Sequence, residues 1–171
     1  MGRAATLRLP SGVTPSVSAL VDTSILIDYL RGHAAARTLL ERERATGVLH
    51  ASEITRLEVL AGMRETEGDA TREGDATRAL LSTLAWHPVD VEIAEIAGAL
   101  GRRWLPSHRS IDSADLAIAA TAIRAGAELL TRNLTSSPPL RMGIPSGRLM
   151  PRLPGLTLHR GRYFRLSLHV L

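Results

Sequence analysis

The chain has no cysteine, no lysine, few aromatic residues and no long apolar run. The absence of cysteine excludes disulfides, thiolate catalysis and cysteine-bound zinc, and it fits a reducing compartment, so we expect a cytoplasmic protein. The longest apolar runs, such as Leu116 to Ile123, are far shorter than the roughly 20 residues that a membrane-spanning helix requires. Arg3 and Arg8 are not followed by an apolar stretch, so we predict no secretion signal.

Acidic residues are missing from both flanks of the chain. All 17 acids lie between Leu20 and Asn133, together with 13 of the 21 arginines, so 13 minus 17 gives this stretch a net charge of −4. The other eight arginines give the two flanks +8. Attraction to a polyanion would therefore come mainly from the flanks, and the overall charge of +4 says little about the central stretch.

Length and patterning predict one α/β domain between two atypical flanks. With 171 residues, 44% of them hydrophobic, the chain can bury one core. Residues 1–18 combine Pro, Gly, Ser and Thr without a sustained period, which predicts a disordered leader. Residues 19–133 alternate apolar strands with helices, which predicts a parallel sheet flanked by helices. Residues 134–171 are rich in Arg, Pro and Leu and contain no acid, and they fit either a poorly ordered tail or a segment that docks a partner.

Apolar periodicity gives the expected order of strands and helices. Strands are expected directly before Asp22 and at 47–50, 86–89 and 128–131, and helices after Asp22 and at 34–45, 55–64, 92–105 and 113–125. The tandem hexapeptide EGDATR occupies 67–72 and 73–78. Two copies are too few for a repeat architecture, so we interpret them as a local duplication in a solvated segment.

Two acids stand beside segments that are expected to be buried. Asp22 directly follows an apolar strand, where it either caps the next helix or presents a Mg²⁺ ligand at the carboxyl end of the strand. Glu58 follows Thr55 by three residues, which fits a capping box. Glu58 is also expected to border the core, because the predicted buried face of its helix consists of Leu57, Leu60 and Ala61.

A second pair of acids begins the 113–125 helix. Asp112 and Asp115 are three residues apart and therefore share a face. A capping role explains Asp112 as well as metal binding does, whereas Asp115 is expected at the mouth of a buried helix. Gathering such carboxylates without a cation would raise the pKa of at least one of them. Because no His or Cys is among them, Mg²⁺ or Mn²⁺ suits the set, and hydrolysis of a nucleic-acid backbone is the predicted chemistry.

Other chemistries have weaker signals. The six histidines are dispersed without HExxH spacing, so we expect surface or packing roles for them. Ser24 lacks the GxSxG context of a hydrolase nucleophile, and neither a GxxxxGK[ST] loop nor a GxGxxG run occurs. A phosphatase of the DxDxT type is disfavoured, since Asp22 is followed by Thr23 and Ser24.

The ordered motifs resemble those of PIN-domain ribonucleases, specifically the VapC-type toxins of bacterial toxin–antitoxin pairs. The matching segments, from about Leu20 to Asn133, are VDTSILIDYLRG, ITRLEVLAGMR, SADLAIAATAIRAG and LLTRN. The resemblance implies an α/β/α sandwich, Mg²⁺-dependent endoribonuclease activity with Mn²⁺ as a substitute, neutralisation by a VapB-type antitoxin, and a homodimer. The alternative is a catalytically inactive PIN module that binds antitoxin or RNA without cleavage.

By position, Asp22, Glu58 and Asp115 match the three catalytic, metal-binding acids of this family. Further candidate metal ligands are Asp112 and Asn133, the latter where many members have a fourth acid. Because an amide adds no negative charge, we predict one firm Mg²⁺ site and a weak second one. The candidate substrate contacts are Thr131, Arg132, Arg109, Arg31 and Arg103.

Both ends of the chain depart from the family pattern. Members usually start within a few residues of the first strand, so residues 1–16 look like an extension. The composition of the segment after Asn133 resembles the product of an altered reading frame in GC-rich DNA. If that origin is correct, the usual final strand is missing.

Overall fold

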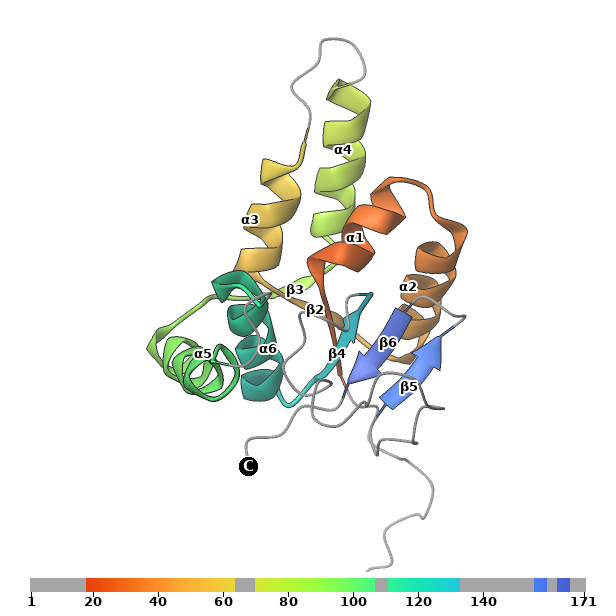
Figure 1. The fold of residues 1–171 in the computed structure, drawn as a ribbon. Coiled ribbons are helices and arrows are strands. Elements are labelled where there is room, and N and C mark those ends of the chain that lie inside the picture. Colours follow the sequence, from red (N-terminus) through yellow and green to blue (C-terminus); the bar gives the residue numbers. More distant parts are fainter. Residues whose placement is uncertain (1–17, 64–69, 107–110, 133–155, 160–162, 167–171) are drawn as a thin grey trace, which may run out of the picture.

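The computed structural model describes residues 18–63, 70–106, 111–132, 156–159 and 163–166. Its six-stranded sheet has the order β3-β2-β1-β4-β6-β5 (Figure 1). The first four strands are parallel, and β6 runs antiparallel to both β4 and β5. The strands are β1 (Ala19–Val21), β2 (Leu49–Ser52), β3 (Ala85–His87), β4 (Glu128–Thr131), β5 (Leu156–His159) and β6 (Tyr163–Leu166).

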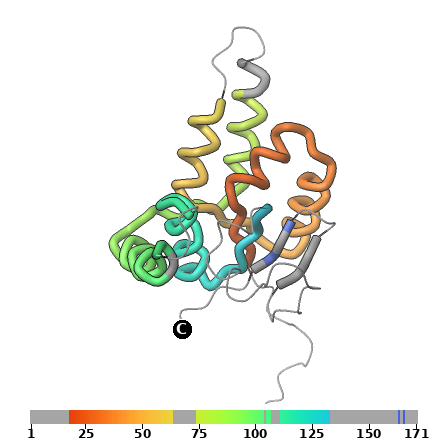
Figure 2. Tube along the Cα trace, in the orientation of Figure 1, coloured from red at the N-terminus to blue at the C-terminus, as the bar shows by residue number. Residues whose placement is uncertain are grey.

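Helices cover both faces of this sheet, as the trace in Figure 2 also shows. One face carries α1 (Thr23–Leu30) and α2 (Ala34–Thr46), and the other carries α5 (Val91–Trp104) and α6 (Ser113–Ala125). Helices α3 (Glu53–Ala61) and α4 (Ala70–Leu81) project beyond the end of the sheet at which β1 stops. The predicted α/β/α sandwich with a short parallel sheet is confirmed. None of the helices in the described ranges is long and apolar enough to cross a membrane.

The central strand β1 is buried on both faces. Ala19 and Val21 belong to the core cluster under α1 and α2, whereas Leu20 packs with Ile118, Ala119 and Ala122 of α6 on the other face. This alternation follows from the two-residue period of a strand. It explains why the strand before Asp22 is continuously apolar, since parallel sheets are usually covered on both sides.

Strong capping signals explain why α6 has the predicted bounds. The Asp112 side chain accepts a hydrogen bond from the backbone N–H of Asp115, and a capping box joins the two residues. The helix ends at Gly126, whose φ of +61° suits a residue without a side chain. Strand β4 then follows within two residues, as predicted.

The predicted buried face of α3 is wrong. Leu57 is 62% exposed and Leu60 is 45% exposed, whereas Thr55 and Val59 face the core. The helix begins directly after β2, with Ser52 rather than Thr55 as its N-cap. The physical reason is that apolar spacing does not determine which side of a helix meets its neighbours, and here Thr55 and Val59, one turn apart, are the buried positions.

The solvated-segment interpretation of the hexapeptide repeat holds only in part for its second copy, in which Asp75, Ala76 and Arg78 are exposed. Residues 73–78 lie within α4, and Thr77 is only 1% exposed. Residues 67–69 of the first copy lie outside the described residues.

The segment 134–171 contributes two strands to the sheet. Strand β6 pairs with β4 through Leu129↔Leu166, Leu130↔Arg165 and Thr131↔Phe164. The expectation that a final strand is missing is therefore wrong. Four-residue strands are too short to give a clear period in a sequence rich in Leu and Arg. Of the predicted leader, only Ser18 belongs to the described residues.

Candidate active site

Asp22 lies where β1 ends and α1 begins. It occupies the N-cap position with extended backbone angles, but its side chain makes no capping hydrogen bond. Instead, Asp22 Oδ2 accepts hydrogen bonds from Ser24 Oγ at 2.8 Å and from Thr131 Oγ1 of β4 at 2.6 Å. The capping interpretation therefore does not account for this carboxylate, which the two hydroxyls orient toward the end of β4.

Glu58 reaches the same edge of the sheet from α3. Its Oε2 atom accepts a hydrogen bond from Thr23 Oγ1 at 2.5 Å, and Thr23 directly follows Asp22 in the chain. Within the described residues, no hydrogen bond engages Asp22 Oδ1 or Glu58 Oε1. Each of these two carboxylates is thus fixed through one oxygen, and the other oxygen is available to a ligand.

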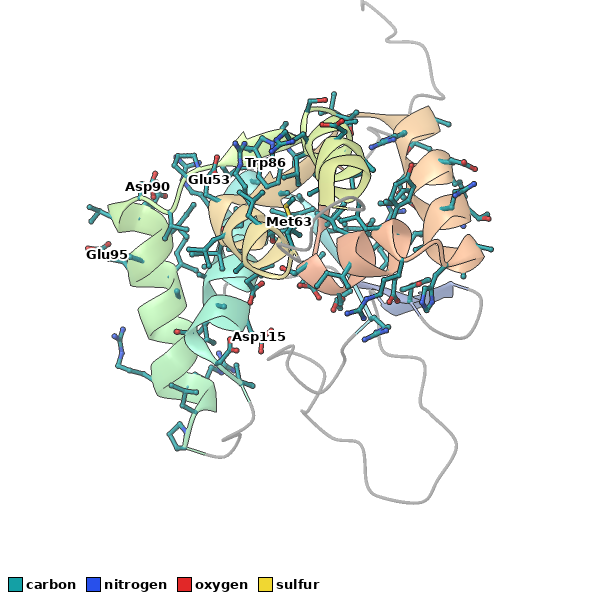
Figure 3. All side chains as sticks on the ribbon, turned by 90° about the horizontal axis from the view of Figure 1, so that it is seen from above. Glu53, Met63, Trp86, Asp90, Glu95 and Asp115 are labelled. Carbon is teal, nitrogen blue, oxygen red and sulfur yellow. The ribbon has the colours of Figure 1, made fainter. Side chains whose placement is uncertain are left out.

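Asp115 lies on the first turn of α6, at the end of the sheet toward which β1 runs (Figure 3). Its Oδ2 atom lies 3.5 Å from the backbone nitrogen of Asp112, and Asp112 Oδ1 accepts the Asp115 N–H at 2.8 Å. The capping role of Asp112 is confirmed, while its role as a ligand stays a prediction. Sequence and topology therefore bring Asp22, Glu58 and Asp115 to one edge of the sheet.

The donor atoms at this edge fit a hard divalent cation in kind, because they are carboxylate oxygens held by hydroxyl groups. In the described ranges, however, no three His, Asp or Glu side chains approach closely enough to form a metal site as they stand.

The predicted substrate contacts have different surroundings. Thr131 is 1% exposed and donates to Asp22. Arg132 is exposed, its backbone N–H donates to Ser24 Oγ at 3.2 Å, and its Nη1 contacts both carboxylate oxygens of Asp28 at 3.0 and 3.1 Å. Arg31 and Arg103 are exposed. Asn133 and Arg109 lie outside the described residues.

Sequence reasoning missed four residues at this edge, namely Thr23, Ser24, Asp28 and Tyr163. The first two carry a usable signal, since hydroxyl residues directly after a strand-ending acid are placed to hold it. Asp28 lies four residues after Ser24, on the buried side of α1, and an acid at such a position predicts a buried partner. Nothing local identifies Tyr163 as one of its partners.

Two of the dispersed histidines form a pair away from the acids. His50 Nδ1 lies 2.9 Å from His87 Nε2, between strands β2 and β3. Burial, and secondarily the neighbouring His87, lowers the pKa of His50 below its usual value. When His50 is neutral, the two rings can share one hydrogen bond, with one nitrogen donating and the other accepting.

The chain is similar to a protein-family model, to curated relatives and to solved structures. The family model for the PIN domain matches residues 19–135. Ribonuclease VapC19 of Mycobacterium tuberculosis is 45% identical over 120 residues, which cover 70% of this chain and 91% of the relative. A toxin-antitoxin complex from Klebsiella pneumoniae contains a chain that is 34% identical, with a TM-score of 0.55 and coverage of 67% of this chain and 86% of that one. The structure of VapBC2 from Rickettsia felis, bound to a DNA fragment from its promoter, supports the fold. Its match has a TM-score of 0.60 at 22% identity and covers 68% of this chain and 88% of that one.

Proposed function

The chain belongs to the PIN-domain family, and within it to the VapC ribonucleases, and from this premise we propose that Asp22, Glu58 and Asp115 hold the metal ion used in RNA cleavage. The protein is the toxin component of a type II toxin–antitoxin system and acts as an endoribonuclease. Nucleases of this kind depend on a metal ion. Because the ligands are oxygen atoms, the proposed ion is Mg²⁺, with Mn²⁺ as a substitute.

The hydroxyl-held carboxylates are the observation that supports this site best. Thr23 fixes one oxygen of Glu58, and Ser24 and Thr131 fix one oxygen of Asp22. Such outer contacts orient ligands before the ion arrives. A bound divalent ion lowers the pKa of a coordinated water and offsets charge on the phosphodiester. The chain itself orients the carboxylates, and Arg132 at the adjacent strand end is the proposed phosphate contact.

The proposed partner is a VapB-type antitoxin, because the solved relatives are toxin–antitoxin complexes. We further propose that the toxin is a homodimer and acts in the cytoplasm, where its RNA substrate and its antitoxin are made.

A cleavage assay tests the metal site. Purified protein is incubated with total bacterial RNA and Mg²⁺, and Asp22→Asn and Glu58→Gln are compared with the wild type. Each substitution should reduce cleavage at least a hundredfold, because it removes a charged ligand while keeping the side-chain shape. The matched control is Glu95→Gln, since Glu95 is exposed and points away from α6 (Figure 3). Equal cleavage by wild type and Asp22→Asn would refute the site.

An inactive PIN module is the second candidate function. It is favoured by the amide at Asn133 and by the absence, within the described ranges, of a ready-made group of three metal-binding side chains. Titration with Mg²⁺, followed by calorimetry, distinguishes the candidates. One firm and one weak site, of which the firm one is lost in Asp22→Asn, supports the nuclease. No binding together with no cleavage supports the inactive module.

A further inference from the structure

Asp28 is a buried acid beside the proposed metal site. It lies on α1 and is 1% exposed, and it accepts hydrogen bonds from two parts of the chain that are distant in sequence. Arg132 Nη1 lies 3.0 Å from its Oδ1 and 3.1 Å from its Oδ2, and Tyr163 Oη donates to Oδ2 at 3.0 Å. A carboxylate this deeply buried needs such partners, so Asp28 joins α1 to the end of β4 and to β6.

The Arg132 side chain is held at one end only. Its Nη1 is engaged by Asp28, while no hydrogen bond from Nε or Nη2 is found among the described residues. The side chain is 46% exposed, in contrast to 2% for its partner. A half-exposed arginine whose Nε and Nη2 donate to none of the described residues has donors left for a ligand. Those donors suit the oxygens of a phosphate group.

The backbone of Arg132 is linked to the proposed metal site. The preceding residue, Thr131, donates to Asp22, and the backbone N–H of Arg132 donates to Ser24, which in turn donates to Asp22. The position of Arg132 is therefore linked to that of the Asp22 carboxylate through two separate hydrogen-bonded routes.

Tyr163 fixes the other side of Asp28 and is itself rigidly placed. It is 1% exposed and packs in the core cluster with Ile25, Leu26 and Leu40. Two residues further along β6, Arg165 forms ion pairs with the buried Glu43 of α2 and with Glu128 of β4. Tyr163 lies outside residues 19–135, the part matched by the PIN-domain model.

From these contacts we propose that Asp28 and Tyr163 are positioning residues, which aim the free donors of Arg132 at an RNA phosphate next to the bond that is cut. This inference rests on the proposed function and extends it. It assigns a role in substrate binding to β6. The Tyr163 hydroxyl of this strand holds Asp28 in one orientation, and Asp28 in turn holds Arg132.

RNA binding at several salt concentrations tests the proposal. The protein carries Glu58→Gln to prevent cleavage, and the probe is a 20-nucleotide fluorescein-labelled single-stranded RNA of mixed sequence, followed by anisotropy. Arg132→Ala should reduce the slope of log affinity against log salt by about 0.7, the value for one phosphate contact on a single strand. Tyr163→Phe should weaken binding about threefold to tenfold, less than the full value of one hydrogen bond to a charged group, because the tyrosine acts on RNA only through Asp28 and Arg132. Arg132→Lys should recover part of the salt slope.

The decisive comparison adds Tyr163→Phe to Arg132→Ala. If the tyrosine acts through the arginine, the added substitution should not weaken RNA binding further. In the cleavage-competent protein, Tyr163→Phe should raise KM about threefold to tenfold and change kcat by less than about twofold. The matched control is Arg124→Ala, because Arg124 is an exposed arginine at the far end of α6, where it pairs with Glu92; it should leave the salt slope unchanged.

Two results would overturn the proposal. In the first, Tyr163→Phe lowers the melting temperature but leaves RNA affinity and salt slope unchanged, which would make the contact purely structural. In the second, Tyr163→Phe weakens binding equally with and without Arg132. Asp28→Asn provides a second test variant. Alone it should weaken RNA binding, and combined with Arg132→Ala it should cause no further loss of affinity. Failure of the metal site is distinguishable, because it would appear as cleavage by Asp22→Asn and would leave these binding results unaffected.

Discussion

The hydrogen bond from Thr23 to Glu58 permits a sharp test of how the active-site carboxylates are held. In Thr23→Val, a methyl group replaces the hydroxyl with little change in volume, so the 2.5 Å contact with Glu58 Oε2 is lost. Thr23 is buried, with 8% exposure, while Glu58 is half-buried. Water can therefore replace the lost donor, but it cannot hold the carboxylate in one orientation.

The expected effect on stability is small and the effect on activity is large. A hydrogen bond to a charged group contributes about 1.5–3 kcal/mol, and hydration of the half-exposed Glu58 should reduce the loss to about 1 kcal/mol. Misplacing a metal ligand lowers activity or metal affinity by about 10- to 100-fold. Urea unfolding measures the first quantity, and RNA cleavage at several Mg²⁺ concentrations measures the second.

Thr55→Val is the matched control for this experiment. Thr55 lies on α3, one turn before Glu58, and its buried Oγ1 has no hydrogen-bond partner within the described residues. Removing an unsatisfied hydroxyl should leave cleavage unchanged and stabilise the fold by about 1 kcal/mol. The reasoning is refuted if Thr23→Val cleaves RNA as fast as the wild type, or if the two variants lose activity to the same extent.

Two further predictions concern stability. Burial lowers the pKa of His50, so the unfolded chain binds more protons than the folded one between the lowered folded value and about 6.5. The free energy of unfolding should therefore fall as the pH drops through this window, and urea titrations should show a weaker dependence in His50→Gln. Arg165→Leu removes one of two arginines bound to the buried Glu43 and should destabilise the fold by about 2–4 kcal/mol. Unchanged thermal unfolding of Arg165→Leu would show that Arg42 alone satisfies Glu43.

Local signals in the sequence predicted those parts of the site that depend on neighbouring residues. The apolar strand before Asp22 placed that acid at the carboxyl edge of the sheet. The capping residues Asp112 and Gly126 gave the bounds of α6, and with them the position of Asp115. In each case the determining contacts lie within a few positions along the chain, which is where periodicity and capping rules apply.

Long-range contacts explain what the sequence did not predict. The exposed Leu57 and Leu60 have the spacing of a buried helix face, yet α3 extends past the sheet and packs through Thr55 and Val59 (Figure 1). Apolar spacing alone does not show which side of a helix meets its neighbours. The pairing of Asp28 with Tyr163 joins residues 135 positions apart, and no local pattern reports such a contact.

That separation along the chain has a consequence for synthesis. A ribosome adds about 5–20 residues per second, so roughly 7–27 s pass between the incorporation of Asp28 and that of Tyr163. For the first 104 residues of this interval the acid on the first helix lacks both partners, and until Tyr163 is added it still lacks the tyrosine. On the proposal above, full RNA affinity therefore waits for β6, which is made after every other strand that the structure describes.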